Sequence, residues 1–434
     1  MHQQLSLSAY DQSLLSGAQG PAARLAMSIL VRMAQVWGAR ELLNISGAHI
    51  DSTIYIGAAG LEFAERLAEM GAKVAVPTTL NVSGLDEHHW QEWPVPEAWA
   101  EQAQRQMVAY RSMGVQPTWT CAPYQTQWKP AFGQQVAWGE SNAIVFANSV
   151  LGARTERYPD LLDICCAITG RAPAVGLHLA ENRAATLLVR LVDIPLALQE
   201  DDTLYPVLGH LLGKLAQNHI PAIDGLQVQP GEDQLKALGA AAASSGAVAL
   251  FHVVGVTPEA PTVEAAFQHK APQQTVDIRL ANLRAARREL TAGPSEGEAD
   301  GKLDMVVLGS PHFSLAEFRQ LALLLTAQLK DGRRRHSSVQ FLVTTSRAVA
   351  LLAKQAGCLA ALEEFGGKVT VDTCILATPM LPAQTKRLMT NSAKYAYYAP
   401  GLLGTWIAFG SLSDCVESAV AGRIVRDDTL WSEP

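Results

Sequence analysis

Three of the six cysteines in this 434-residue sequence stand at the predicted ends of secondary-structure elements. Cys121 follows a predicted strand and precedes a proline, Cys374 lies near the end of a later strand, and Cys415 begins a predicted helix. A thiolate at a helix N-terminus is favoured by the helix dipole and by unpaired N–H groups. The three thiols could together bind a metal or an iron–sulfur cluster, but their wide spacing without a Cys-x-x-Cys pair leaves isolated thiols as the alternative. The other three cysteines lie among apolar residues and are expected to pack in the core.

Small polar residues recur among apolar ones in three further stretches, residues 138–157, 176–183 and 390–394. Buried polar groups need hydrogen-bond partners. These stretches therefore either cap helices and form tight turns, or they bring polar side chains to a binding site. The sequence contains no Walker motif, no GxSxG elbow and no Rossmann fingerprint after a strand, which disfavours a nucleotide-dependent enzyme and a serine hydrolase.

Strands and helices are predicted to alternate, which indicates an α/β fold with largely parallel sheets flanked by helices. Helices are expected over 14–36, 61–70, 161–169, 315–329 and 346–357. Strands are expected over 41–46, 72–76, 118–120, 248–254, 305–308, 339–344 and 368–376. Ligands bind at the carboxyl ends of strands in such sheets. The polar residues that follow these strands are therefore the candidates for a site.

The domain organisation is predicted from one segment rich in Gly, Pro and acidic residues. We expect an N-terminal α/β catalytic region over 1–292, a linker over 293–302 and a C-terminal α/β domain over 303–434 that carries two of the three selected cysteines.

Composition excludes several classes of protein. Apolar residues make up 48% and charged residues 17%, as in a globular protein with a large core. The net charge of −7 and the lack of a basic run argue against a nucleic-acid partner. No apolar run reaches the ~18 residues that cross a bilayer, and no secretory signal is evident. A cytoplasmic protein with reduced cysteines and no membrane partner is expected.

Several uncommon motifs occur in a fixed order along the chain. They are GAHID (47–51), PTTLN (77–81), TCAPY (120–124), WGES (138–141), ANSVLGART (147–155), GLH (176–178), DTC (372–374), TNSAK (390–394) and DCV (414–416). Together they resemble the large subunit of aconitase X, and the resemblance runs from about residue 14 to residue 422.

The resemblance implies an aconitase-like fold of several subdomains and an iron–sulfur cluster, of the 2Fe-2S or the 3Fe/4Fe type, bound through Cys121, Cys374 and Cys415. It also implies a small swivelling domain, which some members carry as a separate subunit. The chain has no room for that domain after residue 422. We therefore expect a heterodimer, or a multiple of it, in which the small subunit completes the active site.

The activity that the resemblance implies is removal of water from a small hydroxy acid. A cluster iron with an open coordination position would act as a Lewis acid on the departing hydroxide. We favour cis-3-hydroxy-L-proline as substrate and Δ1-pyrroline-2-carboxylate as product, because the sequence shows no phosphate-binding cluster. The general base is unknown and could lie on the small subunit. The expected substrate contacts are His49, Thr78, Thr79, Asn81, Ser141, Asn148, Ser149 and Lys394.

Three alternatives stay open. The chain could be a mevalonate 5-phosphate dehydratase, a second activity of the family. It could be a non-catalytic metal-binding subunit of a hetero-oligomer. It could also bind a structural zinc through the three cysteines, and colour distinguishes zinc from an iron–sulfur cluster because zinc sites are colourless.

Overall fold

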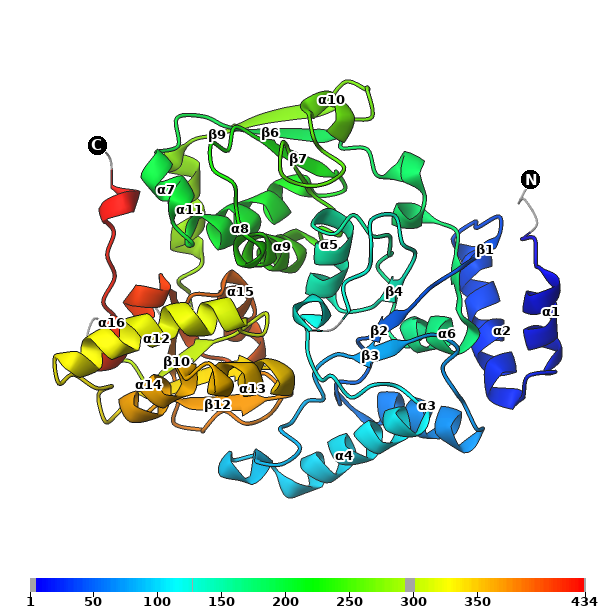
Figure 1. The fold of residues 1–434 in the computed structure, drawn as a ribbon, viewed down its shortest axis with the longest axis horizontal. Helices are drawn as coiled ribbons and strands as arrows, with labels where there is room; N and C mark the ends of the chain where they lie inside the picture. The colour runs from blue at the N-terminus through cyan, green and yellow to red at the C-terminus, as the bar shows by residue number, and fades with distance from the viewer. Residues whose placement is uncertain (1–4, 127, 293–300, 433–434) are drawn as a thin grey trace.

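Three parallel sheets and one antiparallel pair of strands organise the computed structural model, which describes residues 5–126, 128–292 and 301–432. Figure 1 shows the three sheets around the centre of the molecule, with helices outside and between them. The predicted α/β class with largely parallel sheets flanked by helices is confirmed. The predicted boundary at 293–302 falls mostly on residues 293–300, which lie outside the described residues.

The first unit is built on a short parallel sheet in the order β3 (Thr78–Leu80), β2 (Ala48–Ile50) and β4 (Ala137–Trp138). Central strand β2 pairs His49 with Thr79 on one side and with Trp138 on the other. Two further strands, β1 (Leu42–Asn44) and β5 (Arg171–Pro173), form the antiparallel pair. The helices are α1 (Ala9–Ser16), α2 (Pro21–Val36), α3 (Ala58–Glu69), α4 (Glu97–Ser112), α5 (Ser141–Ser149) and α6 (Leu162–Thr169), with 3-10 turns η1 (Trp90–Glu92), η2 (Pro123–Gln125), η3 (Gly176–His178) and η4 (Ala180–Asn182).

The second unit has a parallel sheet in the order β8 (His252–Val253), β7 (Pro221–Asp224), β6 (Leu187–Leu191) and β9 (Gln274–Ile278). Its helices are α7 (Leu196–Glu200), α8 (Leu204–Ala216), α9 (Glu232–Gly246), α10 (Val263–Ala266) and α11 (Leu280–Glu289). Helices α8 and α9 approach closely because glycines face each other, and a Cβ on Gly246 would lie 1.8 Å from the carbonyl oxygen of Gly213.

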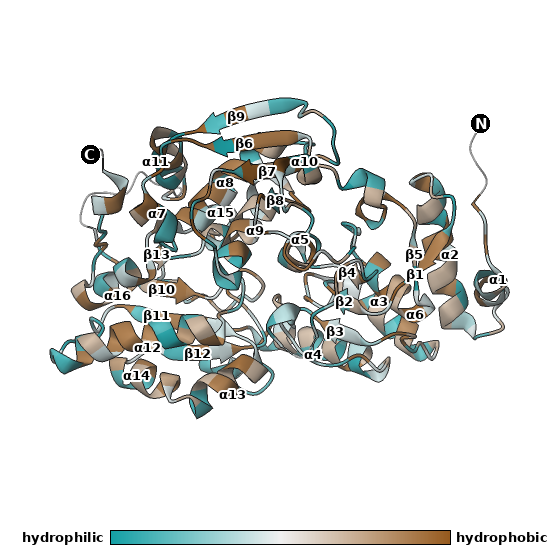
Figure 2. Ribbon diagram, turned by 45° about the horizontal axis from the view of Figure 1, so that its top comes forward, coloured by the Kyte–Doolittle hydropathy of each residue, from teal (hydrophilic) through white to brown (hydrophobic). Residues whose placement is uncertain are grey.

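The third unit has a five-stranded parallel sheet in the order β12 (Lys368–Val371), β11 (Gln340–Thr345), β10 (Met305–Leu308), β13 (Arg387–Thr390) and β14 (Trp406–Phe409). Central strand β10 is buried along its whole length, as expected for a strand covered on both faces. Figure 2 shows β10 as hydrophobic and edge strand β9 of the second sheet as mostly hydrophilic. The helices are α12 (Leu315–Lys330), α13 (Arg347–Gln355), α14 (Cys358–Phe365), α15 (Ala393–Leu402) and α16 (Leu412–Ala421), followed by the 3-10 turn η5 (Thr429–Trp431).

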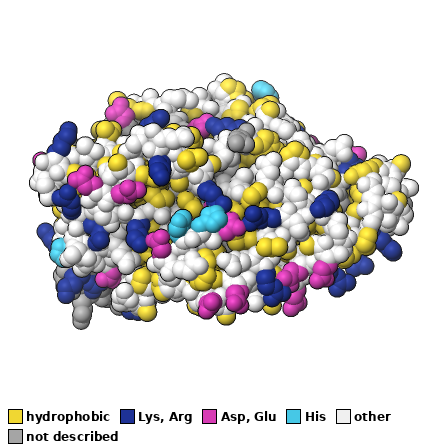
Figure 3. Space-filling model, turned by 60° about the horizontal axis from the view of Figure 1, so that its bottom comes forward, with side chains coloured by type: hydrophobic (Ala, Val, Ile, Leu, Met, Phe, Trp, Pro, Cys, Tyr) yellow, Lys and Arg dark blue, Asp and Glu magenta, His cyan; other side chains and the backbone are white. Residues whose placement is uncertain are grey.

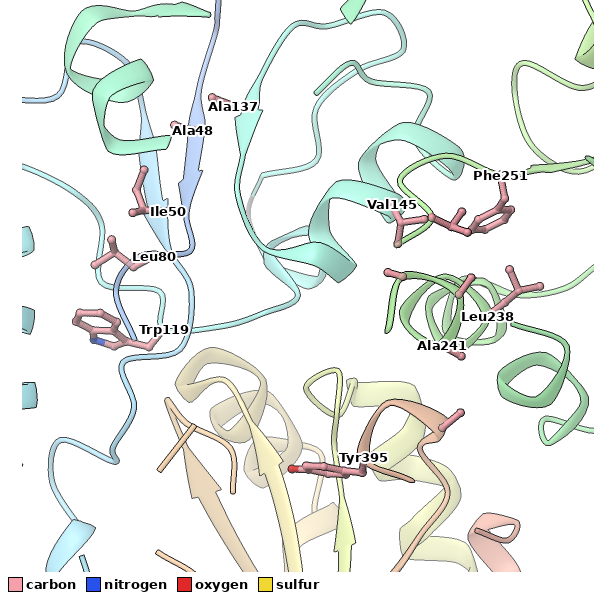
Figure 4. Close-up of a cluster of buried hydrophobic side chains, with 14 of the residues drawn as sticks. Ala48, Ile50, Leu80, Trp119, Ala137, Val145, Leu238, Ala241, Phe251 and Tyr395 are labelled. Atoms are coloured by element: carbon pink, nitrogen blue, oxygen red, sulfur yellow. The ribbon is translucent and has the colours of Figure 1, made fainter. Parts of the chain in front are cut away.

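The two faces of the third sheet belong to different hydrophobic clusters because side chains alternate along a strand. Met305 and Val307 face a large cluster that also contains Tyr395 of α15 and residues of both other units. Val306 and Leu308 face a separate cluster with α12, α14 and α16. Figure 4 shows the large cluster reaching from β2 and β3 across α5 and α9 to Tyr395, so the three units share one core.

Several predicted elements differ from the structure. The helix predicted over 14–36 is two helices, because Gly17 adopts a left-handed conformation and Pro21 starts a new helix at its first turn. No strand forms over 72–76, where Val74 N–H bonds to Met113 and Ala75 N–H bonds to Ala167. The strand of that region is β3, inside the PTTLN motif that was expected to end it.

The predicted strand over 118–120 is also absent, since Trp119 has a left-handed backbone with φ 44°. The strand predicted over 248–254 shortens to β8, and the one over 368–376 shortens to β12. The element predictions over 305–308, 315–329, 339–344 and 346–357 are confirmed within two residues.

The surface is mixed in charge. On the face drawn in Figure 3, basic and acidic side chains lie interspersed, without an extended basic patch. Within the described ranges, no helix combines the length and apolar character that a membrane crossing needs.

Candidate active site

A buried ion pair between Lys394 and Glu140 joins the third unit to the first. Lys394 lies in the first turn of α15, and its Nζ is 2.7 Å from Oε1 of Glu140. Glu140 is the N-cap of α5, where its other oxygen accepts the N–H of Ala143 at 2.7 Å. Burial raises the pKa of Glu140, but Lys394 and the backbone donors outweigh burial and hold that pKa below its usual value. Both partners are therefore charged at neutral pH.

Polar residues at the ends of the first sheet lie beside this pair. Asp51 directly follows β2, Asn81 directly follows β3, and the side-chain amide of Asn81 donates to Asp51. The N–H of Asp51 donates to Asp163 Oδ2 at 2.6 Å. Gly139 follows β4, and a Cβ there would lie 2.6 Å from Asp163 Oδ2 and 3.0 Å from the Cβ of Asp51. The three strand ends therefore form a tight cradle that requires glycine at position 139.

His49 lies in β2, two residues before Asp51 of this cradle. Its Nδ1 is 2.8 Å from the hydroxyl of Thr79 on the neighbouring strand. Burial lowers the pKa of His49 to about 4, although Glu140 and the backbone at Thr120 act in the opposite direction, so the imidazole is neutral. Among the described residues, His49 Nε2 and Asn81 Oδ1 are buried without a hydrogen-bond partner. Buried polar atoms of this kind need an explanation, and a polar ligand at the strand ends would provide one.

Two of the predicted cysteine ligands, Cys121 and Cys374, lie at this same site. Both thiols raise the pKa of Lys394, and the charges of Lys394 and Glu140 act on the pKa of both thiols. Burial is the largest effect on both thiols and raises their pKa, to about 12 for Cys121, while Lys394 opposes it.

His312, which follows β10, connects the two cysteine segments. Its N–H donates to Cys121 Sγ at 3.2 Å. Its Nε2 donates to the carbonyl of Thr373 at 3.0 Å, and its Nδ1 accepts the hydroxyl of Thr120 at 3.0 Å. Burial lowers its pKa to about 4, so this bridge is a neutral imidazole.

Cys415 is not brought to the other two cysteines. It lies in α16, is fully buried in the cluster with Val306 and Ala408, and so faces the side of the sheet away from Tyr395 and α15. Burial raises the pKa of its thiol, and Asp414 is the charged group that adds to this effect. In the parts of the chain that the structure describes, no three His, Cys, Asp or Glu side chains converge as a metal site. The residues thus fit a group held by Cys121 and Cys374, and the three-cysteine set does not fit in this conformation.

The expected substrate contacts divide into two groups. Lys394, Asn81, His49 and Thr79 lie at the site, and the partly exposed Ser141 donates to Glu140 at 3.2 Å. Thr78 is buried and donates to the carbonyl of Val76.

Asn148 and Ser149 have structural partners instead. Asn148 bonds to Thr155, Ala249 and the buried Arg183, while Ser149 accepts the N–H of Phe251 at 2.9 Å. These bonds join α5 to the second unit and use the polar atoms of both side chains. Their assignment as substrate contacts stays a prediction.

Four residues of the site were absent from the sequence-based candidates: Asp51, Glu140, Asp163 and His312. Two of them gave a recognisable signal, because Asp51 follows a strand and Glu140 precedes a helix where an N-cap is needed. The involvement of His312 depends on contacts with segments about 60 and 190 residues away and had no local signal.

This arrangement defines an α/β protein in which strand ends and loops of separate sheets bring together a buried ion pair, two thiols and neutral polar groups. Family models named aconitase X first domain, second domain and third domain match residues 4–181, 185–288 and 303–421. The chain belongs to the aconitase X family.

Relatives of known name agree with this. The chain is 51% identical to a cis-3-hydroxy-L-proline dehydratase of Pseudomonas aeruginosa over 98% of this chain and 72% of that protein. It is 39% identical to a phosphomevalonate dehydratase large subunit of Methanothermobacter thermautotrophicus over 91% of this chain and 94% of that one. The crystal structure of Thermococcus kodakaraensis aconitase X in its holo-form matches with a TM-score of 0.83 and 33% identity, covering 96% of this chain and all of that one.

Proposed function

We propose that this chain is the large catalytic part of a hydro-lyase that removes water from cis-3-hydroxy-L-proline and gives Δ1-pyrroline-2-carboxylate. The observation that carries the proposal is the 51% identity, across almost the whole chain, to a dehydratase named for that substrate. The proposed site agrees with a small zwitterionic substrate, because it offers one cation, Lys394, and nearby carboxylates.

The protein groups at the site would bind and orient such a substrate. The C2 proton becomes acidic only if negative charge can develop on the adjoining carboxylate. In the proposal, Lys394 and the buried amide of Asn81 would stabilise that charge in a water-poor environment. Neutral His49 can donate or accept a hydrogen bond without adding charge.

We further propose that Cys121 and Cys374 bind an iron–sulfur group that would act as a Lewis acid at the substrate hydroxyl. Support comes from the two thiols lying beside Lys394, and from the His312 N–H that already donates to one sulfur. The third ligand predicted from the resemblance, Cys415, would have to leave a hydrophobic cluster to join them.

A second, small subunit is part of the proposal. The Pseudomonas relative extends well beyond the matched region, whereas the archaeal relative is matched over 94% of its length and is called a large subunit. We propose that this chain likewise works with a small subunit, the swivelling domain that the resemblance implies.

Phosphomevalonate dehydratase is the second candidate function, favoured by the archaeal large subunits that match this chain. A phosphate group needs several donors or cations of its own. Lys394 shares its charge with Glu140, so it could pair with a substrate carboxylate but would not balance a phosphate as well, which favours the substrate without phosphate.

The experiment is co-expression with the small subunit, anaerobic purification, and measurement of the visible spectrum and of both dehydratase activities. We expect a coloured protein that converts cis-3-hydroxy-L-proline and does not act on phosphomevalonate. Turnover of phosphomevalonate alone would contradict the proposed substrate.

The cysteine variants test the cofactor separately. We expect Cys121→Ser and Cys374→Ser to lose the colour, with iron and sulfide contents reduced in parallel. If Cys415→Ser also loses the colour while its melting temperature is unchanged, Cys415 is a ligand and moves on cofactor binding. If it keeps colour and metal, two ligands come from this chain. A colourless wild-type protein after iron and sulfide reconstitution would contradict the cluster.

A further inference from the structure

Three carboxyl groups meet at the end of the first sheet, and two of them accept hydrogen bonds or an ion pair from protein groups at both oxygens. Glu140 binds Lys394 with one oxygen and caps α5 with the other. Asp163 accepts from the N–H groups of Asp51 and Ile164 and from the hydroxyl of Ser52. Each of these two carboxylates therefore has a protein donor at both of its oxygens.

The third carboxyl, Asp51, is different. Its Oδ1 accepts from Asn81, and no described residue donates to Oδ2. Asp51 is also partly exposed, whereas Glu140 and Asp163 are 4% and 1% exposed. Asp51 is thus the carboxyl that a bound molecule can reach.

The backbone fixes where this carboxyl points. Asp51 is the first residue after β2, its N–H is bonded to buried Asp163, and Asn81 binds its side chain from the next strand. Gly139 closes the remaining side, where a Cβ would contact the Cβ of Asp51 at 3.0 Å. An acid held by three neighbouring strand ends is preorganised for one direction of attack.

The charges around Asp51 also suit a base. Burial is the largest effect, and with Glu140 and Asp163 it raises the pKa of Asp51 to about 7, against Lys394 and Asn81, which lower it. The imidazole of nearby His49 is neutral and adds no charge to this set. A general base works best when its pKa lies close to the operating pH.

We propose that Asp51 is a catalytic residue of this chain and accepts the C2 proton of the hydroxy acid substrate. The proposal rests on the dehydratase function proposed above. The pair of electrons of the C2–H bond forms the C2–C3 double bond, the C3–O bond breaks with its pair on oxygen, and Asp51 holds the proton. The departing hydroxide is then protonated to water, which leaves an enamine that tautomerises to the cyclic imine.

The stereochemistry is compatible with one carboxylate as base. In cis-3-hydroxy-L-proline the hydroxyl and the carboxylate share a ring face, so the C2 hydrogen and the hydroxyl lie on opposite faces. The proton and the hydroxide can therefore leave toward different parts of the site. Asp51 lies at the first sheet, while the proposed cofactor ligands Cys121 and Cys374 lie at the junction with the third unit.

The test compares Asp51→Asn and Asp51→Glu with wild type, all as the complete coloured enzyme with its small subunit. For D51N we expect kcat to fall at least 100-fold, within the range for losing a general base, while KM changes less than about threefold. D51E keeps the carboxylate and should recover part of the lost kcat. Asp277→Asn removes an exposed carboxylate that pairs with Arg190 and should leave kcat unchanged.

The pH dependence of kcat/KM distinguishes a general base from a residue with a structural role, because only the base adds an acidic limb. A base must be deprotonated, so wild-type kcat/KM should fall as the pH drops through about 7, the value to which the pKa of Asp51 is raised. The residual activity of D51N should lack this acidic limb. D51N with activity within threefold of wild type, or a wild-type profile that is flat between about pH 6 and 8, would overturn the proposal.

Different results would contradict the proposed dehydratase function and the proposed role of Asp51. A wild-type enzyme that is coloured and folded but inactive on cis-3-hydroxy-L-proline would contradict the proposed function. An active wild type with an active D51N would contradict only the assignment of Asp51 and place the base elsewhere, including on the small subunit.

Discussion

At the scale of the residue, the site depends on side chains that are charged in a buried place and on others that are kept neutral there. Lys394 and Glu140 are 254 positions apart in the chain and yet form an ion pair with side chains 13% and 6% exposed. Burial of one such charge without the other costs several kcal/mol. His49 and His312 avoid this cost because burial keeps both imidazoles uncharged.

Removal of Lys394 should therefore affect stability as well as activity. Lys394→Met leaves Glu140 buried without its cation, and we expect the free energy of unfolding to fall by about 3–5 kcal/mol in denaturant titrations. The double variant Lys394→Met, Glu140→Gln removes both charges and should recover a large part of that loss. A double variant that is less stable than Lys394→Met would show that the pair is not the source of the effect.

At the scale of the element, the three strands of the first sheet matter mainly for where they end. Each is only two or three residues long, yet together they place Asp51, Asn81 and Gly139 side by side. The loop after β12 is fixed in a comparable way, because Arg347 at the start of α13 binds buried Asp372 through Nε at 3.0 Å, two residues before Cys374. Short strands and helix starts here act as supports for single side chains.

The cradle at the end of the first sheet predicts a glycine requirement. Gly139→Ala would place a Cβ 2.6 Å from Asp163 Oδ2. Since Asp163 holds the backbone of Asp51, we expect kcat/KM for the dehydration to fall at least tenfold. The matched control is Gly401→Ala in α15, where a Cβ meets nothing within 4 Å and should leave the activity unchanged. Equal activity of both variants would contradict the cradle.

At the scale of the whole molecule, helix α9 connects the three units. It packs against α8 of its own unit, against α5 of the first unit and against α15 of the third. Lys236 of α9 is 2% exposed and binds Glu317 at the start of α12 as well as Asp233, at 2.8 Å. Its Nζ also lies 3.4 Å from the carbonyl of His312, so this buried cluster is continuous with the cysteine site.

This junction gives a pH-dependent prediction. Burial raises the pKa of Glu317 to about 7 even though Lys236 lowers it. Lys236→Met removes the cation, so the pKa of Glu317 should rise further and its charged form should become costly. The melting temperature of the variant should then be depressed more at pH 8, where Glu317 must either carry an unpaired buried charge or take up a proton on folding, than at pH 5.5, where it is already protonated in the folded state.

The control for this junction is Lys214→Met, which breaks an exposed pair with Glu289 and should change the unfolding free energy by less than about 0.5 kcal/mol. A Lys236→Met variant as stable as this control at pH 8 would contradict a structural role for the cluster.

The sequence by itself determined the fold class, the family and most elements of the third unit. Strand β10 is an uninterrupted apolar run, and helix α12 starts with the capping box of Ser314 and Glu317, so local signals agree with the structure there. The sequence also placed His49, Thr79, Asn81 and Lys394 among the candidates, through the motifs that resemble aconitase X, although His49 and Thr79 lie inside β2 and β3 and not after a strand end.

Only the tertiary structure decided which partners these residues bind and which of them stay accessible. The sequence could not show that Asn148 and Ser149 form hydrogen bonds with the second unit, or that Cys415 faces the opposite side of the third sheet from α15. Nor could it show that Glu140 takes the lysine while Asp51 remains accessible. The physical reason is that charge pairing and hydrogen-bond saturation depend on which distant segments meet, and that is set by the packing of three sheets around one core.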